Sequence, residues 1–580
     1  MPSQDGPGIG SPYGPSPQYG APPPQGQPYG APPQYGPPYP TYTPYVKPER
    51  VKYSFTPCDA AFACFAFVLG FLVYEWRIGS SLGAFLVIAV ALIGTLLYMN
   101  ARGVRQNFRS VSIFIVCLIS ALPLILYDSI PINFLLFLFT VCACFYWILV
   151  SAGNSVEERI SGYVLADWLN QTFAIPFSNF LGLFISIKTV TKETKRSKTI
   201  LIGIVGICIA IPLIIGVTSL LIRSDAGFEK FAEDFSDWFK LDDIGRYILQ
   251  FIGGIPIAMY IFGSACGNIQ KRYTNSITKD SVSAGLASAH KIPGAAILAP
   301  LAILCILYIV YMIVMGVYLF SAFAGTLPEG LTYWDYARNG FFELCGIAAI
   351  NLFMLVFTYS FAKRAAGEYP KPMRALTGLL CVMTELLVVT AVSKMLLYID
   401  AFGLSRLRVY VLWFLIMLFI IFAILIVWHI RPYIKKPAGF TPFNAGRPIV
   451  IVAVCFTLAL FLANTDGIIA KYNVWQYESG KSETVDTFML SEMSDAVLPH
   501  LARLRDTAPD IEVRSDAAWA LEMIKYRHEY GVGMLPEPKD GFRDWNIQSF
   551  LAKKYLSADT EYELLFSERY NHYMERSLVY

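Results

Sequence analysis

The chain has 580 residues, of which 55% are hydrophobic and only 15% are charged, and its formal net charge is +3. Soluble proteins carry about 25% charged residues, so this composition argues against a set of soluble domains, and the small net charge argues against a nucleic-acid partner. Repeated apolar runs of roughly 17–25 residues instead predict an all-α integral membrane protein.

Residues 1–52 form the first predicted domain, a tail in which Pro, Gly, Tyr and Gln dominate. Short repeats recur in it, such as PQYG at 17–20 and at 33–36. A segment of this composition buries too little apolar surface to offset the entropy lost on ordering, so we expect a disordered tail. One interpretation is a solvated spacer, and the alternative is a multivalent tail whose Tyr and Pro side chains bind protein partners.

Residues 53–463 are predicted to form a polytopic transmembrane domain with about eleven helices. The spans are predicted at 57–76, 81–99, 111–127, 131–151, 199–222, 247–265, 296–321, 341–361, 375–398, 408–429 and 447–463. Two aromatic-rich segments between spans, 160–187 and 226–240, are interpreted as lying at the membrane interface. A lid over a cavity between the helices is the alternative interpretation of 226–240.

The orientation is predicted from the charges in the loops. Lys and Arg concentrate in the connections after the second, fourth, sixth, eighth and tenth predicted spans. Because cytoplasmic loops carry the excess of positive charge, this pattern predicts a plasma-membrane protein with a cytoplasmic N-terminal tail. An odd number of spans then predicts that the C-terminal domain is extracytoplasmic.

Residues 464–580 lack long apolar runs and are predicted to form a small helical domain outside the membrane. Apolar residues recur at helical spacing over 486–505, where Pro499 is expected to break or kink the helix. Ser515 is predicted to be the N-cap of a helix over 516–529, and further helices are predicted at 545–556 and 560–575. The predicted partners are membrane lipids, together with proteins that bind the tail or this domain.

Five segments, in order between about residues 330 and 550, are motifs that resemble one family. They are 333–344 (YWDYARNGFFEL), 395–408 (MLLYIDAFGLSRLR), 464–473 (NTDGIIAKYN), 490–499 (LSEMSDAVLP) and 542–546 (FRDWN). As a set they resemble the bacterial polytopic membrane family called domain of unknown function forty-one seventy-three, which is related to family forty-one fifty-three. The chain departs from the family pattern at Phe402, Ser405 and Asp544. The resemblance implies an integral membrane protein and supplies no activity or catalytic residues.

On the predicted topology, eight charged residues gather at the outer ends of the last four spans. They are Asp335, Arg338, Glu343, Lys394, Asp400, Arg406, Arg408 and Asp466. Opposite charges placed in this way predict an ion-paired network that ties the helices together and docks the C-terminal domain. Two alternatives are a pocket for an anionic headgroup or polymer, and a catalytic dyad of Glu343 and Asp400.

A carboxylic acid is predicted inside the membrane at Glu385, near the middle of the span 375–398. An ionisable group at this depth is costly and is therefore a candidate functional residue. Asn351 lies at a similar depth in the span 341–361, and we expect the two side chains to pair. The pair is interpreted as an interhelical polar tie or as a proton or cation relay.

The sequence contains no zinc-protease motif, no phosphate-binding loop and no nucleophile elbow. We therefore predict no catalytic residue, no metal ligand and no cofactor. The predicted function is a non-enzymatic scaffold or sensor in cell-envelope processes. The alternative is a secondary transporter or channel that uses Glu385 and the outer-face charge cluster.

Overall fold

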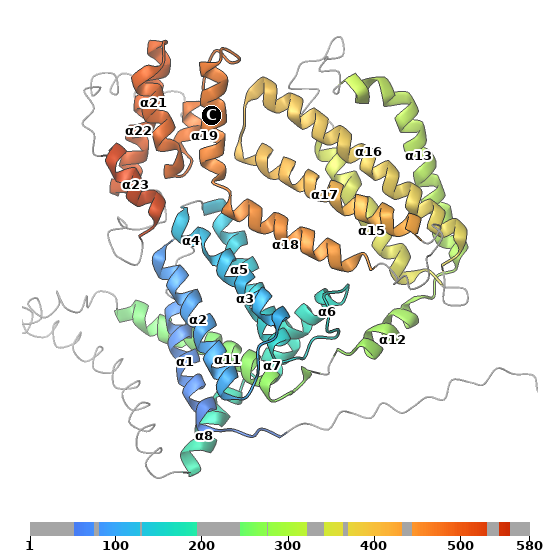
Figure 1. The fold of residues 1–580 in the computed structure, drawn as a ribbon, viewed down its shortest axis with the longest axis vertical. Helices are drawn as coiled ribbons and strands as arrows, with labels where there is room; N and C mark the ends of the chain where they lie inside the picture. The colour runs from blue at the N-terminus through green and yellow to red at the C-terminus, as the bar shows by residue number, and fades with distance from the viewer. Residues whose placement is uncertain are drawn as a thin grey trace, which may run out of the picture. The chain divides into compact units, whose positions relative to one another are not determined.

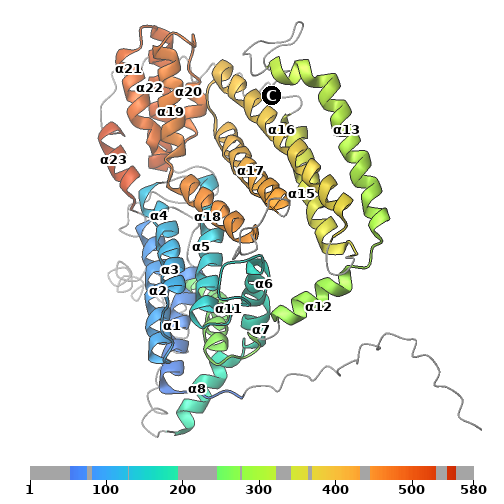
Figure 2. The same ribbon diagram turned by 45° about the vertical axis from the view of Figure 1, so that its right-hand side comes forward.

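A computed structural model describes residues 52–74, 81–127, 130–193, 244–274, 277–321, 341–363, 369–431, 444–530 and 545–556. In these ranges the regular structure is helical, and they contain no β-strand. The arrangement of the helices is shown from two directions in Figures 1 and 2.

The long apolar helices occupy most of the described chain up to residue 462. They are α1 (Pro57–Tyr74), α2 (Leu82–Ala101), α3 (Phe108–Ala121) with α4 (Pro123–Leu126), α5 (Ile130–Ser151), α11 (Ile244–Ile269), α13 (Gly294–Ser321), α15 (Phe341–Phe361), α16 (Lys371–Phe402), α17 (Arg406–Ile430) and α18 (Gly446–Leu462). A short helix, α12 (Lys279–Ala289), precedes α13.

Shorter helices form the C-terminal part of the chain. They are α19 (Thr465–Glu478), α20 (Thr487–Ser491), the 3-10 helix η5 (Asp495–Val497), α21 (Leu498–Thr507), α22 (Ile511–Tyr530) and α23 (Ile547–Leu556). We refer to α19–α23, with η5, as the C-terminal helices.

Seven helices in the described residues are long and apolar enough to cross a membrane, or up to nine if each of two bent pairs is one span. Every predicted span except 199–222 overlaps a helix, and 199–222 lies outside the described residues. The predicted number of eleven is not confirmed. The apolar parts of α1 and α15 are shorter than the other spans, and α18 meets the length criterion only together with α19, after a bend of 66°.

The segment predicted to lie at the membrane interface, 160–187, contains a second bent pair. It comprises α6 (Val164–Leu169), a π-helical turn (Asn170–Ala174), α7 (Ile175–Ser178) and α8 (Gly182–Glu193). The two halves meet at 49°, and together they are long and apolar enough for a broken span or a re-entrant loop. The other predicted interfacial segment, 226–240, lies outside the described residues.

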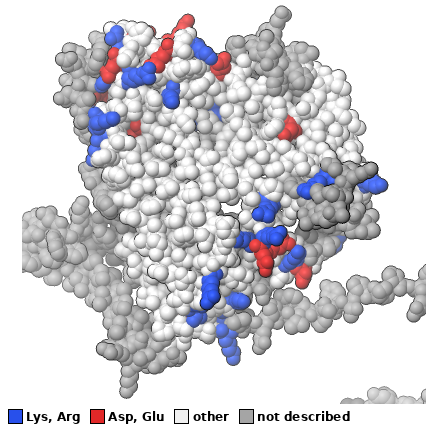
Figure 3. All heavy atoms as spheres, viewed as in Figure 1, with Lys and Arg blue, Asp and Glu red and all other residues white. Residues whose placement is uncertain are grey.

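Three clusters of buried apolar side chains hold these helices together. The first joins α1, α2, α3, α5 and α11, and α18 adds Phe461 to it. The second joins α13, α15, α16 and α17, which lie side by side in Figure 2. The third is built from the C-terminal helices. Figure 3 shows charged side chains over the C-terminal helices and near the α6 and α12 ends, with a largely uncharged surface between them. A surface of this kind is typical of a membrane-embedded protein.

One expectation for the C-terminal helices was wrong, and another was confirmed. Ser515 is not an N-cap, because α22 already begins at Ile511, where the carboxylate of Asp510 accepts a hydrogen bond of 2.8 Å from the Glu512 amide. The break expected near Pro499 is present, because the segment 486–505 is divided into α20, η5 and α21, and Pro499 lies in the first turn of α21, where proline's missing amide costs nothing. The helix predicted at 545–556 is present as α23, and the one predicted at 560–575 lies outside the described residues.

The close crossing of α1 and α11 depends on glycine. A Cβ atom at Gly70 of α1 would lie 2.3 Å from the carbonyl oxygen of Gly254, and one at Gly254 would lie 2.9 Å from the Phe71 amide nitrogen. Small residues allow membrane helices to approach this closely, because van der Waals contact is a main source of their association in lipid.

We expect Gly254→Val to separate α1 from α11 and to destabilise the protein by about 1–3 kcal/mol, since overpacking forces backbones apart. A lower apparent Tm in detergent would measure this effect. Gly346→Val is the control, because a Cβ at Gly346 meets no other atom within 4 Å. Equal effects of the two substitutions would contradict the prediction.

Candidate functional site

A buried carboxylate, Asp59, lies at the start of α1 and is 0% exposed. The sequence Thr56-Pro-Cys-Asp59 places it where a helix cap is made, because the side chain of the third helical residue can reach back to the amide that precedes the helix. Asp59 Oδ2 accepts hydrogen bonds from the Thr56 amide (2.6 Å) and the Thr56 hydroxyl (2.7 Å). Local sequence therefore explains half of the carboxylate's contacts.

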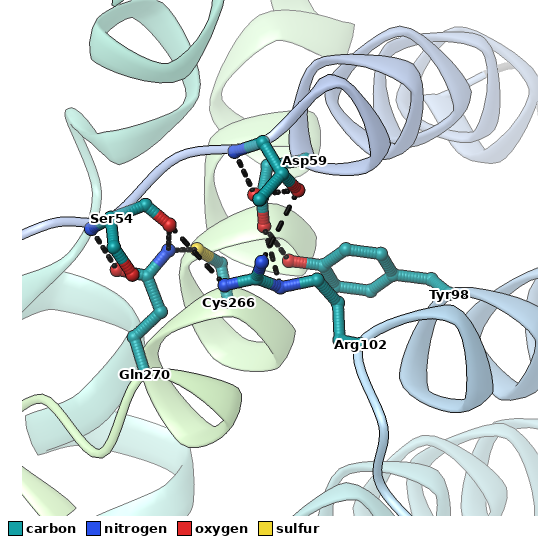
Figure 4. Close-up of polar contacts among 7 residues, drawn as sticks. Ser54, Asp59, Tyr98, Arg102, Cys266 and Gln270 are labelled. Carbon is teal, nitrogen blue, oxygen red and sulfur yellow. Dashed lines mark hydrogen bonds and ion pairs between the residues drawn. The ribbon is translucent and has the colours of Figure 1, made fainter.

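The other contacts of Asp59 come from the end of α2, as Figure 4 shows. The Tyr98 hydroxyl donates a hydrogen bond of 2.6 Å to Asp59 Oδ1, and Arg102 Nε lies 3.5 Å from the same oxygen. Arg102 also donates to the Thr56 hydroxyl oxygen (3.2 Å) and to the Ser54 carbonyl (3.3 Å). The arginine thus neutralises the buried charge and ties the chain before α1 to α2.

The segment that precedes α1, residues 52–56, is here called the N-terminal strap. The end of α11 holds it through Gln270, whose Oε1 accepts from the Ser54 amide (3.1 Å) and whose Nε2 donates to the Ser54 carbonyl (3.4 Å). Figure 4 shows Cys266 beside Gln270, which donates a hydrogen bond of 3.3 Å to the Cys266 sulfur. The strap is therefore fastened to α11 as well as to α2.

A third contact holds the strap at Tyr53. Its hydroxyl donates a hydrogen bond of 3.0 Å to Asn179, and the Arg272 guanidinium lies 3.5 Å from the centre of its ring. The residues on either side of Arg272, Lys271 and Tyr273, have φ angles of 51° and 59°. Positive φ is unfavourable for such side chains and persists where the surroundings hold it. Burial raises the pKa of the Tyr53 hydroxyl, and the Arg272 charge offsets part of this rise.

Sequence reasoning missed the strap and its anchor. The motif Thr56-x-x-Asp59 ahead of an apolar run is a capping-box signal and was available in the sequence. No sequence pattern indicates that Arg102, 43 residues further along the chain, is the partner of Asp59. That pairing is a property of the tertiary structure.

A second buried carboxylate, Asp466, lies in the first turn of α19 and is 1% exposed. Arg406, in the first turn of α17, donates two hydrogen bonds of 2.8 Å, one to each oxygen of this carboxylate. The Ser494 amide donates a further hydrogen bond of 3.0 Å to Asp466 Oδ2. We call these three residues the C-terminal joint. Two parallel N–H···O bonds are the strongest geometry for an arginine–carboxylate pair.

The loop between α16 and α17 is held against α19 by amide side chains. Asn473 accepts a hydrogen bond from the Leu404 amide (2.7 Å) and donates one to the Leu404 carbonyl (2.9 Å). Gln476 donates to the Asp400 carbonyl (3.0 Å). Gly403 has a φ of 73°, and a Cβ there would lie 2.7 Å from the Asn473 oxygen. The glycine in this loop is therefore required both by backbone conformation and by the approach of α19.

The turn at residues 491–495 receives side chains from several helices. Arg527 of α22 donates to the Ser491 carbonyl (3.1 Å) and to the Met493 carbonyl (2.8 Å). His528 Nε2 lies 2.8 Å from the carboxylate of Asp495. Together with the joint, these contacts link the start of α17 to α22 through one short turn.

Other members of the predicted outer-face cluster have different roles. Arg408 donates to the Phe402 and Gly403 carbonyls at the end of α16 (2.7 and 2.6 Å), so it caps its own loop. Asp400 lies 3.7 Å from Lys481, and both side chains are more than half exposed. Glu343 and Lys394 are close enough for their opposite charges to attract each other. Asp335 and Arg338 lie outside the described residues.

Asn351 and Glu385, the predicted intramembrane pair, have different surroundings in the structure. Asn351 is fully buried, donates a hydrogen bond of 2.9 Å to the Thr384 hydroxyl and accepts one of 2.7 Å from the Tyr308 hydroxyl. These three residues join α13, α15 and α16. Glu385, the residue after Thr384, has a buried Oε2 that makes no hydrogen bond. The tie between the helices is thus made by Asn351 with Thr384 and Tyr308.

The strap and the C-terminal helices meet opposite ends of α2. Arg102 follows the last residue of α2, whereas the amide of Leu82, its first residue, donates a hydrogen bond of 2.8 Å to the Trp545 carbonyl. A helix of 20 residues is about 30 Å long, which is the thickness of the apolar part of a bilayer. The two fastened segments are therefore a membrane thickness apart.

These features define the class of protein: a polytopic α-helical membrane protein with buried ion pairs at the ends of its helices. A family model described as a domain of unknown function, DUF4153, matches residues 113–504. The match covers more than half of the chain, and the chain belongs to this family. DUF4153 is the relative of family forty-one seventy-three, the family that the motifs resemble, and assignment to forty-one seventy-three itself is not confirmed. No curated protein and no solved structure matches the chain. In the described part of the chain, no group of His, Cys, Asp and Glu side chains is arranged to hold a metal ion.

We expect Asp466→Asn to loosen the C-terminal helices, because it leaves the guanidinium of Arg406 without its counter-charge. Breaking a buried pair costs about 3–5 kcal/mol, and the lower end applies here because Arg406 is one-quarter exposed. Hydrogen exchange of α19–α21 in the full-length protein would report this as faster exchange. Asp400→Asn is the matched control, since an exposed ion pair contributes about 0–1 kcal/mol. Similar protection in wild type and Asp466→Asn would refute the role of the joint.

The pair of Asp495 and His528 predicts a dependence on pH. Burial alone would raise the pKa of Asp495, but the hydrogen bond and charge of His528, with smaller effects of Ser549 and Arg527, outweigh it and lower this pKa. A lowered carboxyl pKa stabilises the fold above the ordinary value of about 4, and this stabilisation is lost as the pH falls through the lowered pKa. We therefore expect the amides of α22 to exchange faster in His528→Gln than in wild type near neutral pH.

The difference in exchange protection between His528→Gln and wild type should disappear in acid, because a protonated Asp495 no longer needs a counter-charge. His500→Gln, in α21, is the control for a histidine outside this pair. A difference that keeps growing as the pH falls below about 4 would contradict the assignment.

Proposed function

We propose that this protein is a non-enzymatic scaffold or sensor of the plasma membrane that acts in cell-envelope processes. In this proposal the N-terminal tail is cytoplasmic, and the C-terminal helices form an extracytoplasmic domain over residues 464–580. The observation that carries the proposal is the pair of buried anchors. Asp59 fastens the strap that continues into the tail, and Asp466 fastens the C-terminal helices.

Rigid attachment on both faces suits a protein that links events across a membrane. A displacement of the strap acts directly on α2 and α11, since Arg102 and Gln270 hold it. A displacement of the C-terminal helices acts on the α16–α17 hairpin through Arg406, and on α2 through Leu82. Because α2 receives a contact at each end, it connects the two segments directly.

The function is tested by comparing variants with complete loss of the gene in a host that carries it. The full set of growth defects under envelope stress is first recorded for the deletion strain. We expect removal of residues 1–45, and separately Asp59→Asn and Asp466→Asn, to reproduce most of these defects. Asp400→Asn should not, and immunoblots of membranes would show that each variant is present in normal amounts. Normal growth of the tail deletion and of both Asp variants would refute the scaffold proposal.

A secondary transporter or channel is the second candidate, because Glu385 has a buried carboxylate oxygen without a hydrogen bond inside an apolar helix. Such a group is a recurring feature of proton and cation pathways. The outer-face cluster supports this candidate less well, because Arg406 and Asp466 neutralise each other and Arg408 caps its own loop. In the same strains, a transporter predicts that Glu385→Gln alone reproduces the deletion, whereas a scaffold predicts normal growth.

A further inference from the structure

The last described helix, α23, has one face that packs inward and one face that is open. Ala552 is buried in the core of the C-terminal helices. On the other side, Phe550 and Leu551 are 57% and 56% exposed. Lys553 and Lys554 are exposed as well. Adjacent large apolar side chains next to two lysines are unusual on a surface that faces only water, and they indicate an interaction surface.

The open face lies level with the ends of two membrane-length helices. Trp545, two residues before α23, accepts the hydrogen bond from the Leu82 amide at the first residue of the span Leu82–Ala101. α23 also contacts α4, which ends the span Phe108–Leu126. In Figure 1, α23 accordingly lies close to the ends of α2 and α4. The position of α23 along the membrane normal is therefore set by helices that begin or end at the membrane surface.

We infer that α23 is a membrane-surface helix, whose open face is seated in the lipid headgroup region. Phe550 and Leu551 would enter the boundary of the acyl chains, and Lys553 and Lys554 would meet lipid phosphates. Trp545 lies where aromatic residues gather at membrane surfaces, and it is partly exposed. The ligand class is thus the anionic phospholipid headgroup.

The bilayer is favoured over a protein partner because α23 lies at the start of α2, a helix of membrane-spanning length whose exposed surface is apolar. The exposed side chains of α2 between Leu82 and Tyr98 are apolar, and they are Leu86, Val90, Ile93 and Leu97. A protein partner on α23 would have to displace lipid from the ends of α2 and α4. The inference is independent of the proposed scaffold role, since it concerns only how the C-terminal helices are seated.

Two contacts of different chemistry then hold the C-terminal helices at the membrane. The joint of Arg406 and Asp466 is an internal ion pair and does not depend on lipid. The α23 contact depends on the bilayer, and its basic part depends on headgroup charge. Lipid composition would therefore change the seating of α23 while leaving the joint in place.

Photo-crosslinking of the full-length protein in liposomes tests the inference. Phe550 is replaced by p-benzoylphenylalanine, and the vesicles contain phosphatidylcholine with or without phosphatidylglycerol. Ile511 is the control position, because it is 70% exposed and is the first residue of α22. A probe there does not disturb the contacts between α22 and the 491–495 turn, which come from Arg527 and His528 near the other end of the helix. We expect lipid adducts, identified by mass spectrometry, at position 550 and not at 511. Crosslinks from 550 to a second copy of the chain, or no adduct at 550, would overturn the inference.

The role of the lysines has its own test. Lys553→Glu with Lys554→Glu, combined with the probe at 550, should lower the adduct yield several-fold in vesicles that contain phosphatidylglycerol and should have little effect in phosphatidylcholine alone. An equal yield from both proteins in the anionic vesicles would overturn the assignment of the lysines to headgroup phosphates. Unchanged hydrogen exchange in α21 and α22 shows that the C-terminal helices remain folded in each variant.

Discussion

The cost of burying a carboxylate governs how this protein is joined together. Asp59 and Asp466 are almost fully removed from solvent, and each is compensated by an arginine from another helix and by a backbone amide. Removing an ionised group from water costs several kcal/mol unless such partners are present. Each pair therefore works only when the two helices that supply it are correctly placed. This requirement makes Arg102 and Arg406 the residues that position the strap and the C-terminal helices.

Between these two anchors, the membrane part is held by packing and by neutral hydrogen bonds. Gly70 and Gly254 allow α1 and α11 to approach within backbone contact. A similar use of neutral groups occurs where Gln171, in the π-helical turn, accepts from Asn268 (2.6 Å) and donates to Ser264 (2.6 Å). Paired amides and hydroxyls satisfy each other inside lipid at far lower cost than charges. The ionic groups are thus concentrated where a joint must be specific, and the neutral groups where helices must only stay in contact.

The positions of the helices could be predicted well, because each depends on a run of apolar residues long enough to cross a bilayer. Contacts between distant residues could be predicted only in part. Arg406 and Asp466 were in the predicted cluster as opposite charges on one membrane face, but the prediction did not specify which members of the cluster form a pair. Glu385 and Asn351 were placed at the same depth, but depth does not specify direction around a helix. Asn351 meets Thr384, the residue before Glu385, and one residue along a helix turns a side chain by about 100°.

The sequence by itself determined the class of protein, the approximate places of its helices and the division between apolar and polar parts, because all of these follow from local composition and from the length of a membrane span. The tertiary structure alone decided which of many carboxylates and arginines are paired, that Asp59 is an anchor, and that α2 receives contacts at both ends. The physical reason is that a buried charge is stabilised by geometry within a few ångströms. That geometry comes from segments such as 52–56 with 266–272, or 404–406 with 466–476, which are far apart in the chain.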